Sequence, residues 1–156
     1  MLPQTHMLLG IVFVAAIFLI FPSVGILGAS IIFLSSFLID IDHYIYYVYK
    51  KKSINPLRAY KWYTDHKTKC HSLSKEQKKK THFGTYFLHG IEILMILFTL
   101  GFFVSPIFYF ILIGFTFHLI LDLSLEIIKF NEFNKISVLY TFLKSRGLTF
   151  IDDLDF

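Results

Sequence analysis

Two carboxylates and an imidazole, Asp40, Asp42 and His43, lie within four residues at the end of a long apolar run. No formally charged side chain precedes Asp40 in the sequence. A carboxylate at the edge of an apolar environment costs several kcal/mol unless it is paired or bound to a metal ion. The chemistry that these residue types support is therefore ion pairing or metal binding.

Further imidazoles and carboxylates lie in the other apolar parts of the chain. His118 and Asp122 are four residues apart, so both side chains can reach one metal ion from a helix. His89 and Glu92 lie in one apolar block, where such residues usually serve a function rather than packing. His6 precedes the first apolar run. These residues extend the candidate site to four segments of the chain.

The elements that must position these residues follow from the composition. The chain is 55% apolar, with a mean hydropathy of +0.62, which is typical of a membrane protein. Its apolar residues fall into two blocks, 7–39 and 83–128, and a proline interrupts each block once. We therefore expect one all-α, membrane-embedded domain over residues 1–156, an integral bundle of two helical hairpins. The expected helices are residues 6–21, 24–48, 82–104 and 107–129, with a basic loop at 50–81 and a partly helical tail at 130–156.

The distribution of positive charge predicts the orientation in the cell membrane. Eleven of the fifteen basic residues lie between Lys50 and Lys80, and the other four lie between Lys129 and Arg146. By the positive-inside rule the basic loop and both termini are cytoplasmic. We expect this loop, with its tyrosines and lysines, to lie near anionic lipid head groups. The only cysteine, Cys70, excludes an internal disulfide.

This topology places the candidate ligands of all four helices in the cytoplasmic half of the bundle. The outer half, roughly residues 18–27 and 96–113, has no histidine and no acidic or basic residue. Mixed nitrogen and oxygen ligands suit zinc best here, with manganese or iron as alternatives, and the number of candidates favours one or two ions. Two ions could activate water and stabilise the oxygens of a phosphoester, with Glu92 or Asp42 as general base.

Several of these elements together resemble the membrane-bound metal-dependent hydrolase family (YdjM-like, inner membrane-associated). The resemblance covers about residues 5–125, and its elements are Thr5-His6, Asp40-Ile41-Asp42-His43, His89-Gly90-Ile91-Glu92, and Gly114 with His118-Leu119-Ile120-Leu121-Asp122. It implies a helical membrane protein with a layout similar to that of zinc-dependent phospholipases C. The metal ligands that it implies are His6, Asp40, Asp42, His43, His89, His118 and Asp122.

One element of that family, His-Arg-x-x-Thr-His-Ser before the third helix, is missing from this chain. Residues 66–72, with His66 and His71, keep its spacing, whereas His82 and His89 lead into the helix. We favour His89, because it lies at the membrane level of the other ligands. The missing arginine leaves only lysines of the basic loop to bind a substrate phosphate, and lysine lacks the bidentate fork of arginine.

The sequence supports two functions and a structural alternative. The first is a metal-dependent hydrolase, phosphatase-like or phospholipase-C-like, that acts on a phosphoester, such as that of a phospholipid, at the cytoplasmic face. The second is a non-catalytic metal-binding membrane protein, a sensor or scaffold. In the structural alternative the buried histidines and acids only pair with one another. We expect membrane lipids, and no nucleic acid, as partners.

Overall fold

The computed structural model describes residues 3–82, 84, 86–130 and 137–151. The chain divides into two compact units. The first unit comprises residues 1–40 and 87–137, and the second comprises residues 41–86 and 138–156. The described chain is almost entirely helical, in agreement with the predicted all-α class.

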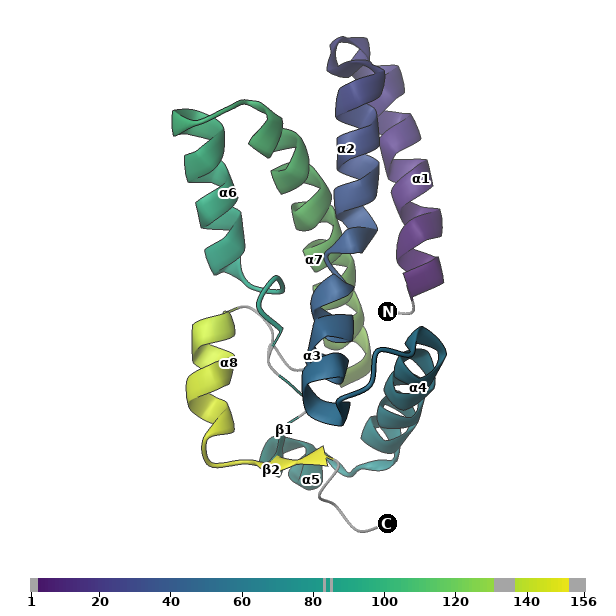
Figure 1. Ribbon diagram of the computed structural model, residues 1–156, viewed down its shortest axis with the longest axis vertical. Helices are drawn as coiled ribbons and strands as arrows, with labels where there is room; N and C mark the ends of the chain where they lie inside the picture. Colours follow the sequence, from purple (N-terminus) through teal and green to yellow (C-terminus); the bar gives the residue numbers. More distant parts are fainter. Residues whose placement is uncertain (1–2, 83, 85, 131–136, 152–156) are drawn as a thin grey trace. The chain divides into compact units, whose positions relative to one another are not determined.

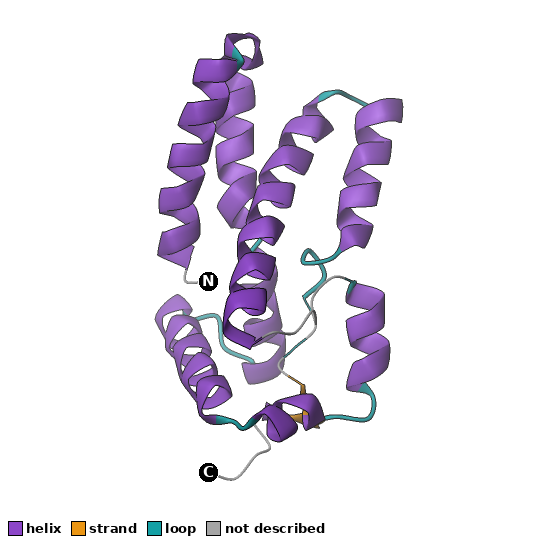
Figure 2. Ribbon diagram, turned by 180° about the vertical axis from the view of Figure 1, so that it is seen from behind, coloured by secondary structure: helices purple, strands orange, loops and turns teal. Residues whose placement is uncertain are grey.

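The first unit consists of two helical hairpins (Figure 1). Its elements are α1 (Pro3–Ile20), the 3₁₀ turn η1 (Pro22–Val24), α2 (Gly25–Leu38), α6 (Ile91–Phe103) and α7 (Ile107–Phe130). α2 packs against both α1 and α7, and α6 packs against α7. Both hairpin turns lie at one end of this unit in both ribbon views (Figures 1 and 2). The start of α1, the end of α2 and the start of α6 therefore lie together at the opposite end.

Small residues allow the helices of the first unit to approach closely. A Cβ atom on Gly114 of α7 would lie 2.5 Å from the backbone oxygen of Ile32 in α2, and one on Gly10 would lie 2.5 Å from Ser36 Oγ. The hydroxyl groups of Ser35 and Ser36 donate hydrogen bonds to carbonyls of their own helix. Both serine hydroxyls are therefore hydrogen-bonded although the helices pack closely around them, as is typical of helix contacts in membranes.

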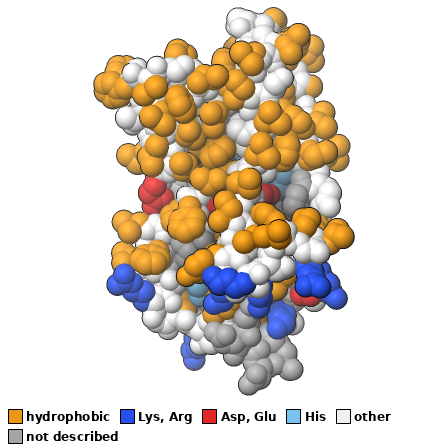
Figure 3. All heavy atoms as spheres, viewed as in Figure 1, with side chains coloured by type: hydrophobic (Ala, Val, Ile, Leu, Met, Phe, Trp, Pro, Cys, Tyr) orange, Lys and Arg blue, Asp and Glu red, His pale blue; other side chains and the backbone are white. Residues whose placement is uncertain are grey.

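The outer surface of the first unit is apolar. Leu19, Ile26, Leu27 and Phe103 are between 72% and 80% exposed, and Figure 3 shows hydrophobic side chains over the visible face of these helices. Exposed apolar surface of this extent is typical of contact with lipid. Two helical segments among the described residues, Pro22–Lys51 and Ile107–Leu125, are long and apolar enough to cross a membrane.

The other two expected spans are not among these two segments. The apolar helices Gln4–Ile20 and Ile91–Phe103 are shorter than both, and Ile91–Phe103, with 13 residues, is well below the length of about 20 residues that an ordinary bilayer crossing requires. α6 begins at Ile91 instead of residue 82 because Gly90 has extended backbone angles and serves as its N-cap. His82 and His89 thus lie outside the helix that carries Glu92, whereas the expected helix 82–104 included all three residues. The four-span bundle remains a prediction.

The expected helix 24–48 is also divided. α2 ends at Leu38, residues 39 and 40 form a turn, and α3 (Ile41–Lys51) begins the second unit. This turn lets the Asp40 carboxylate approach two imidazoles of the first unit, as described below. The prediction of one continuous helix over residues 24–48 is therefore wrong, and Asp40 and His43 belong to different units.

The second unit contains α3 and five further short elements. These are α4 (Pro56–Ser72), α5 (Lys75–Lys80), β1 (Thr81–His82), α8 (Val138–Ser145) and β2 (Thr149–Phe150). β1 and β2 form a short parallel pair. Asn55 caps α4, and Ser74 and Gln77 form a capping box at α5. The predicted loop at 50–81 is therefore largely helical, whereas the partly helical tail is confirmed by α8.

Candidate metal centre

Five ionisable side chains of the first unit converge at the end of the unit opposite its hairpin turns. His6 comes from the first turns of α1, Asp40 follows α2, and His89 precedes α6. His118 and Asp122 lie one helical turn apart on α7. All except Asp40 are at least 94% buried. Segments far apart in the sequence thus bring three imidazoles and two carboxylates together in an apolar environment.

Four donor atoms of this group form a compact cluster. His89 Nε2 and His118 Nε2 are 3.2 Å apart, and Asp40 Oδ1 lies 3.4 Å from the first and 3.5 Å from the second. Asp122 Oδ2 lies 3.8 Å from His89 Nε2 and 3.7 Å from His118 Nε2. These atoms, Asp40 Oδ1, His89 Nε2, His118 Nε2 and Asp122 Oδ2, are called the four-donor cluster below.

Five separations within the four-donor cluster lie close to the edge lengths of a metal coordination tetrahedron. Tetrahedral zinc with ligand distances of about 2.0–2.2 Å requires donors about 3.3–3.6 Å apart. The five measured separations range from 3.2 to 3.8 Å. Two imidazoles and two carboxylates are also a donor set that zinc, manganese and iron accept. The geometry and the chemistry of these donors therefore both fit a divalent ion.

The other ring nitrogen of His118 fixes this imidazole for metal binding. His118 Nδ1 lies 2.8 Å from the backbone oxygen of Ser36, in the last turn of α2, and donates a hydrogen bond to it. With the proton on Nδ1, the lone pair of Nε2 faces the four-donor cluster. A hydrogen bond of this kind to a backbone carbonyl is typical of metal-bound histidines.

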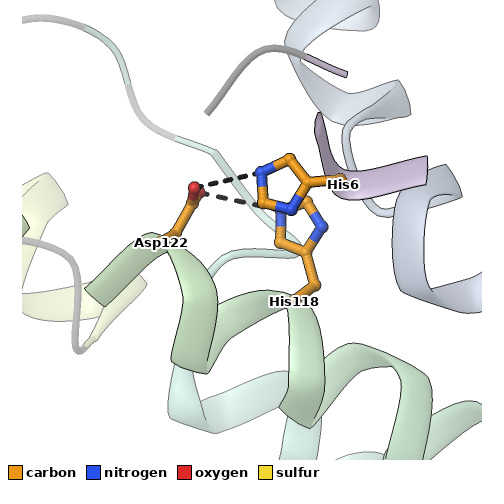
Figure 4. A group of neighbouring side chains, drawn as sticks. All are labelled: His6, His118 and Asp122. Atoms are coloured by element: carbon orange, nitrogen blue, oxygen red, sulfur yellow. Dashed lines mark ion pairs between the residues drawn. The ribbon is translucent and has the colours of Figure 1, made fainter. Parts of the chain in front are cut away.

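His6 provides a fifth donor beside the four-donor cluster. Its ring stacks on that of His118, with centroids 3.9 Å apart, and its Nε2 lies 3.2 Å from Asp122 Oδ1 (Figure 4). His6 is 1% exposed, yet neither of its ring nitrogens makes a hydrogen bond. One donor each from His6, His118 and Asp122 lies within 4.8 Å of the other two, a spacing that could hold a metal ion. Asp122 therefore presents one oxygen to His6 and the other to His89 and His118.

Asp42 and His43, two more predicted ligands, belong to the second unit. Asp42 is 2% exposed, and its Oδ1 lies 2.7 Å from His43 Nδ1. The His43 ring stacks on Tyr86, and the Tyr63 hydroxyl donates a hydrogen bond to the His43 backbone oxygen. Asp42 thus orients the His43 imidazole. Whether either residue binds metal remains a prediction.

The sequence analysis missed Tyr63 and Tyr86, which surround His43. Burial, followed by the neighbouring Tyr86, raises the pKa of the Tyr63 hydroxyl well above its usual value. This hydroxyl is therefore a hydrogen-bond donor at neutral pH. Aromatic residues are frequent at membrane interfaces, so no sequence pattern distinguishes Tyr63 and Tyr86 from the neighbouring tyrosines.

Glu92, the predicted general base, lies in the first turn of α6. Its Oε1 accepts a hydrogen bond from the Ser137 hydroxyl. The positive end of the α6 dipole stabilises negative charge at this position. Its role as a base remains a prediction.

The alternative histidines of the missing family element, His66, His71 and His82, belong to the second unit. His66 is on α4, and its Nδ1 lies 2.8 Å from the Trp62 backbone oxygen. His82 lies in β1. Of the histidines that were weighed against each other, His89 belongs to the cluster, in agreement with the preference stated above.

Comparison with protein-family models, curated proteins and solved structures finds no match to this chain.

Proposed function

We propose that this protein is a membrane-embedded, metal-dependent hydrolase that cleaves a phosphoester at the cytoplasmic face. The observation that carries the proposal is the four-donor cluster, which lies among apolar helices and has the spacing of a metal coordination shell. The resemblance of its motifs to membrane-bound metal-dependent hydrolases supports the same function.

Ion pairing alone accounts less well for this arrangement. The Nε2 atoms of His89 and His118 face each other at 3.2 Å, and both face the same oxygen of Asp40. A single proton between two imidazoles satisfies one donor and one acceptor, and two protons would place positive charges side by side in a buried site. One divalent cation satisfies all four donors at once.

His6 and Asp122 Oδ1 would hold a second ion beside the four-donor cluster. An ion held at these residues would supply Lewis acidity and a hydroxide nucleophile at neutral pH. The chain itself fixes the imidazoles through Ser36 and Asp122, and it excludes water through the apolar helices around them. Glu92 would accept a proton as the general base. The basic residues of the segment 50–80 would attract an anionic substrate.

The first experiment measures metal content per chain in detergent-purified protein, after zinc or manganese is offered during purification. We expect one or two equivalents in the parent, and loss in both Asp40→Ala and His118→Ala, because both residues contribute to the four-donor cluster. His82→Ala is the matched control, since His82 lies in the second unit. Unchanged metal content in the His118→Ala protein would refute the site.

A metal sensor or scaffold is the second candidate function. It is favoured by the four-donor cluster itself, because four protein ligands can close a tetrahedral ion and leave no position for water. Hydrolysis of a phospholipid or of a soluble aryl phosphate by metal-loaded protein separates the two functions. For the enzyme we expect Glu92→Gln to retain metal and to lose activity. If the metal-loaded parent hydrolyses neither substrate, the sensor is favoured.

A further inference from the structure

We propose that residues 49–61, which comprise the end of α3, the connection to α4 and the first turns of α4, bind the surface of an anionic phospholipid bilayer. This segment is called the basic turn below. It belongs entirely to the second unit and shares no residue with the metal centre. The inference therefore does not depend on whether the protein binds metal or hydrolyses a phosphoester.

The basic turn exposes large apolar side chains. Ile54 and Leu57 are 78% and 79% exposed, Tyr49 is 71% exposed, and Tyr60 is 43% exposed. Ile54, Leu57 and Tyr60 follow one another at intervals of three residues, from the residue before the Asn55 cap into the second turn of α4. Aliphatic and tyrosine side chains together are typical of segments that enter the head-group region of a bilayer.

Basic residues alternate with these apolar side chains. Lys50, Lys51, Lys52, Arg58 and Lys61 lie in the same thirteen-residue segment, and no acidic residue occurs between Asp42 and Asp65. Positive charge beside exposed apolar side chains is complementary to an anionic lipid surface, which offers phosphates and hydrocarbon together. A nucleic acid would use the charges but would leave Ile54 and Leu57 in water.

The basic turn is held in a fixed conformation rather than as a loose loop. The Tyr44 hydroxyl donates a 2.5 Å hydrogen bond to the Ile54 backbone oxygen. Asn55 Oδ1 accepts hydrogen bonds from the backbone nitrogens of Leu57 and Arg58, and Ala59 is buried. The exposed side chains are therefore presented without a further ordering cost on binding, which favours affinity.

Lys52 directly follows the last residue of α3 and ends this helix. Its φ of 52° lies in the left-handed region, and its backbone nitrogen donates a hydrogen bond to the Val48 oxygen. Its Nζ lies 4.7 Å from the centre of the Tyr49 ring, so a positive charge and an exposed aromatic ring lie side by side in the basic turn.

The test places an environment-sensitive dye on the basic turn of the full-length protein. Leu57→Cys in a Cys70→Ser background is labelled and reconstituted into nanodiscs of phosphatidylcholine, with or without phosphatidylglycerol. We expect a blue shift and quenching by spin-labelled lipid with phosphatidylglycerol, and a much smaller effect without it. Thr68→Cys, at an exposed position of the same helix, is the control and should remain in water.

Charge variants test the role of the basic residues. Each lysine or arginine near an anionic membrane surface contributes about 1 kcal/mol, which corresponds to a change of about fivefold in binding. Arg58→Gln/Lys61→Gln should therefore reduce the equilibrium constant for docking of the basic turn about 25-fold. Lys67→Gln/Lys80→Gln should leave this constant nearly unchanged. A dye at residue 57 that stays in water in both lipids would overturn the proposal. Equal blue shifts in both lipids would overturn it as well. The same holds for a blue shift that appears without lipid and depends on the protein concentration.

Discussion

His118 has two ring nitrogens with different tasks. Nδ1 is held by the Ser36 carbonyl, and Nε2 faces Asp40, His89 and Asp122. The sequence showed the His118–Asp122 spacing, which predicts that both side chains lie on one face of a helix. It could not show the Ser36 contact, because that acceptor is a backbone carbonyl and carries no signal in the residue type.

Replacement of Asp122 by asparagine tests its contacts to three imidazoles. The two side chains have nearly the same shape, but asparagine has no negative charge and only one strong acceptor oxygen. We expect zinc affinity to fall at least 100-fold, since loss even of a group that only orients a ligand costs about 10–100-fold. Competition titration with a zinc chelator measures this change. Ser124→Ala, at an exposed position of the same helix, should retain the parental affinity.

The lowered pKa of His82 predicts that acid decreases the stability of the second unit. Burial, followed by the neighbouring Lys50, lowers the pKa of His82 below its usual value of 6.5. The unfolded chain therefore binds a proton at this residue at a higher pH than the folded chain does. The contribution of the neutral imidazole to the free energy of unfolding is fully present above about pH 6.5 and decreases as the pH falls. We expect His82→Gln to show a weaker loss of stability on acidification. Thermal melts at a series of pH values measure it, and parallel pH profiles would contradict the prediction.

At the scale of the elements, the contact between α2 and α7 positions the site. These helices carry Ser36 and His118, and they approach closely where Gly114 faces Ile32 and Ser35. A Cβ on Gly114 would meet a backbone oxygen, which cannot rotate away. The position of His118, one helical turn after Gly114, therefore depends on this glycine.

Gly114→Ala should destabilise the protein although alanine favours helix formation. The intrinsic gain from alanine in a helix is about 0.5–1 kcal/mol, whereas overpacking costs about 1–3 kcal/mol. We expect a net loss of about 1–2 kcal/mol, together with weaker metal binding, because α7 must move away from α2. Detergent unfolding curves measure the first effect. Gly147→Ala is the control, because no atom lies within 4 Å of its Cβ position.

The sequence predicted helix type well and helix ends poorly. Apolar runs with proline turns predicted α7 and the start of α2 to within one residue and α1 to within three, because long uncharged segments have few other ways to satisfy their backbone. The predicted end of α2, at residue 48, was wrong, because this helix ends at Leu38. The break at Asp40 and the late start of α6 depend on tertiary contacts of Asp40 and His89. The pairing of β1 with β2 joins residues 68 positions apart, as in Thr81 with Thr149, and no local pattern indicates it.

At the scale of the whole molecule, charge is segregated between the units. All basic residues except Lys129 and Lys135 belong to the second unit, whereas α1 and α2 carry no charged residue. Two segments of the chain have the length and composition of membrane spans. The positive-inside rule then predicts that the second unit faces the cytoplasm.

Cys70, the single cysteine, tests this orientation. A membrane-impermeant maleimide should label Cys70 in inside-out vesicles and not in right-side-out vesicles, because Cys70 lies in the basic second unit. In a Cys70→Ser background, Ser23→Cys at the exposed turn between α1 and α2 should show the reverse pattern. Labelling of both positions from the same side would contradict the predicted topology. Mass spectrometry of the labelled chain gives the measurement.

The hydrogen bond from His118 to the Ser36 carbonyl also bears on the order of biogenesis. It joins residues 82 positions apart, and the carbonyl belongs to the last turn of α2, where no partner exists within the helix. During synthesis, α1 and α2 emerge long before α7, so the end of α2 must wait for the fourth apolar segment. In the proposed function, metal loading is therefore a late step of biogenesis, because a nascent chain halted before α7 lacks His118 and Asp122.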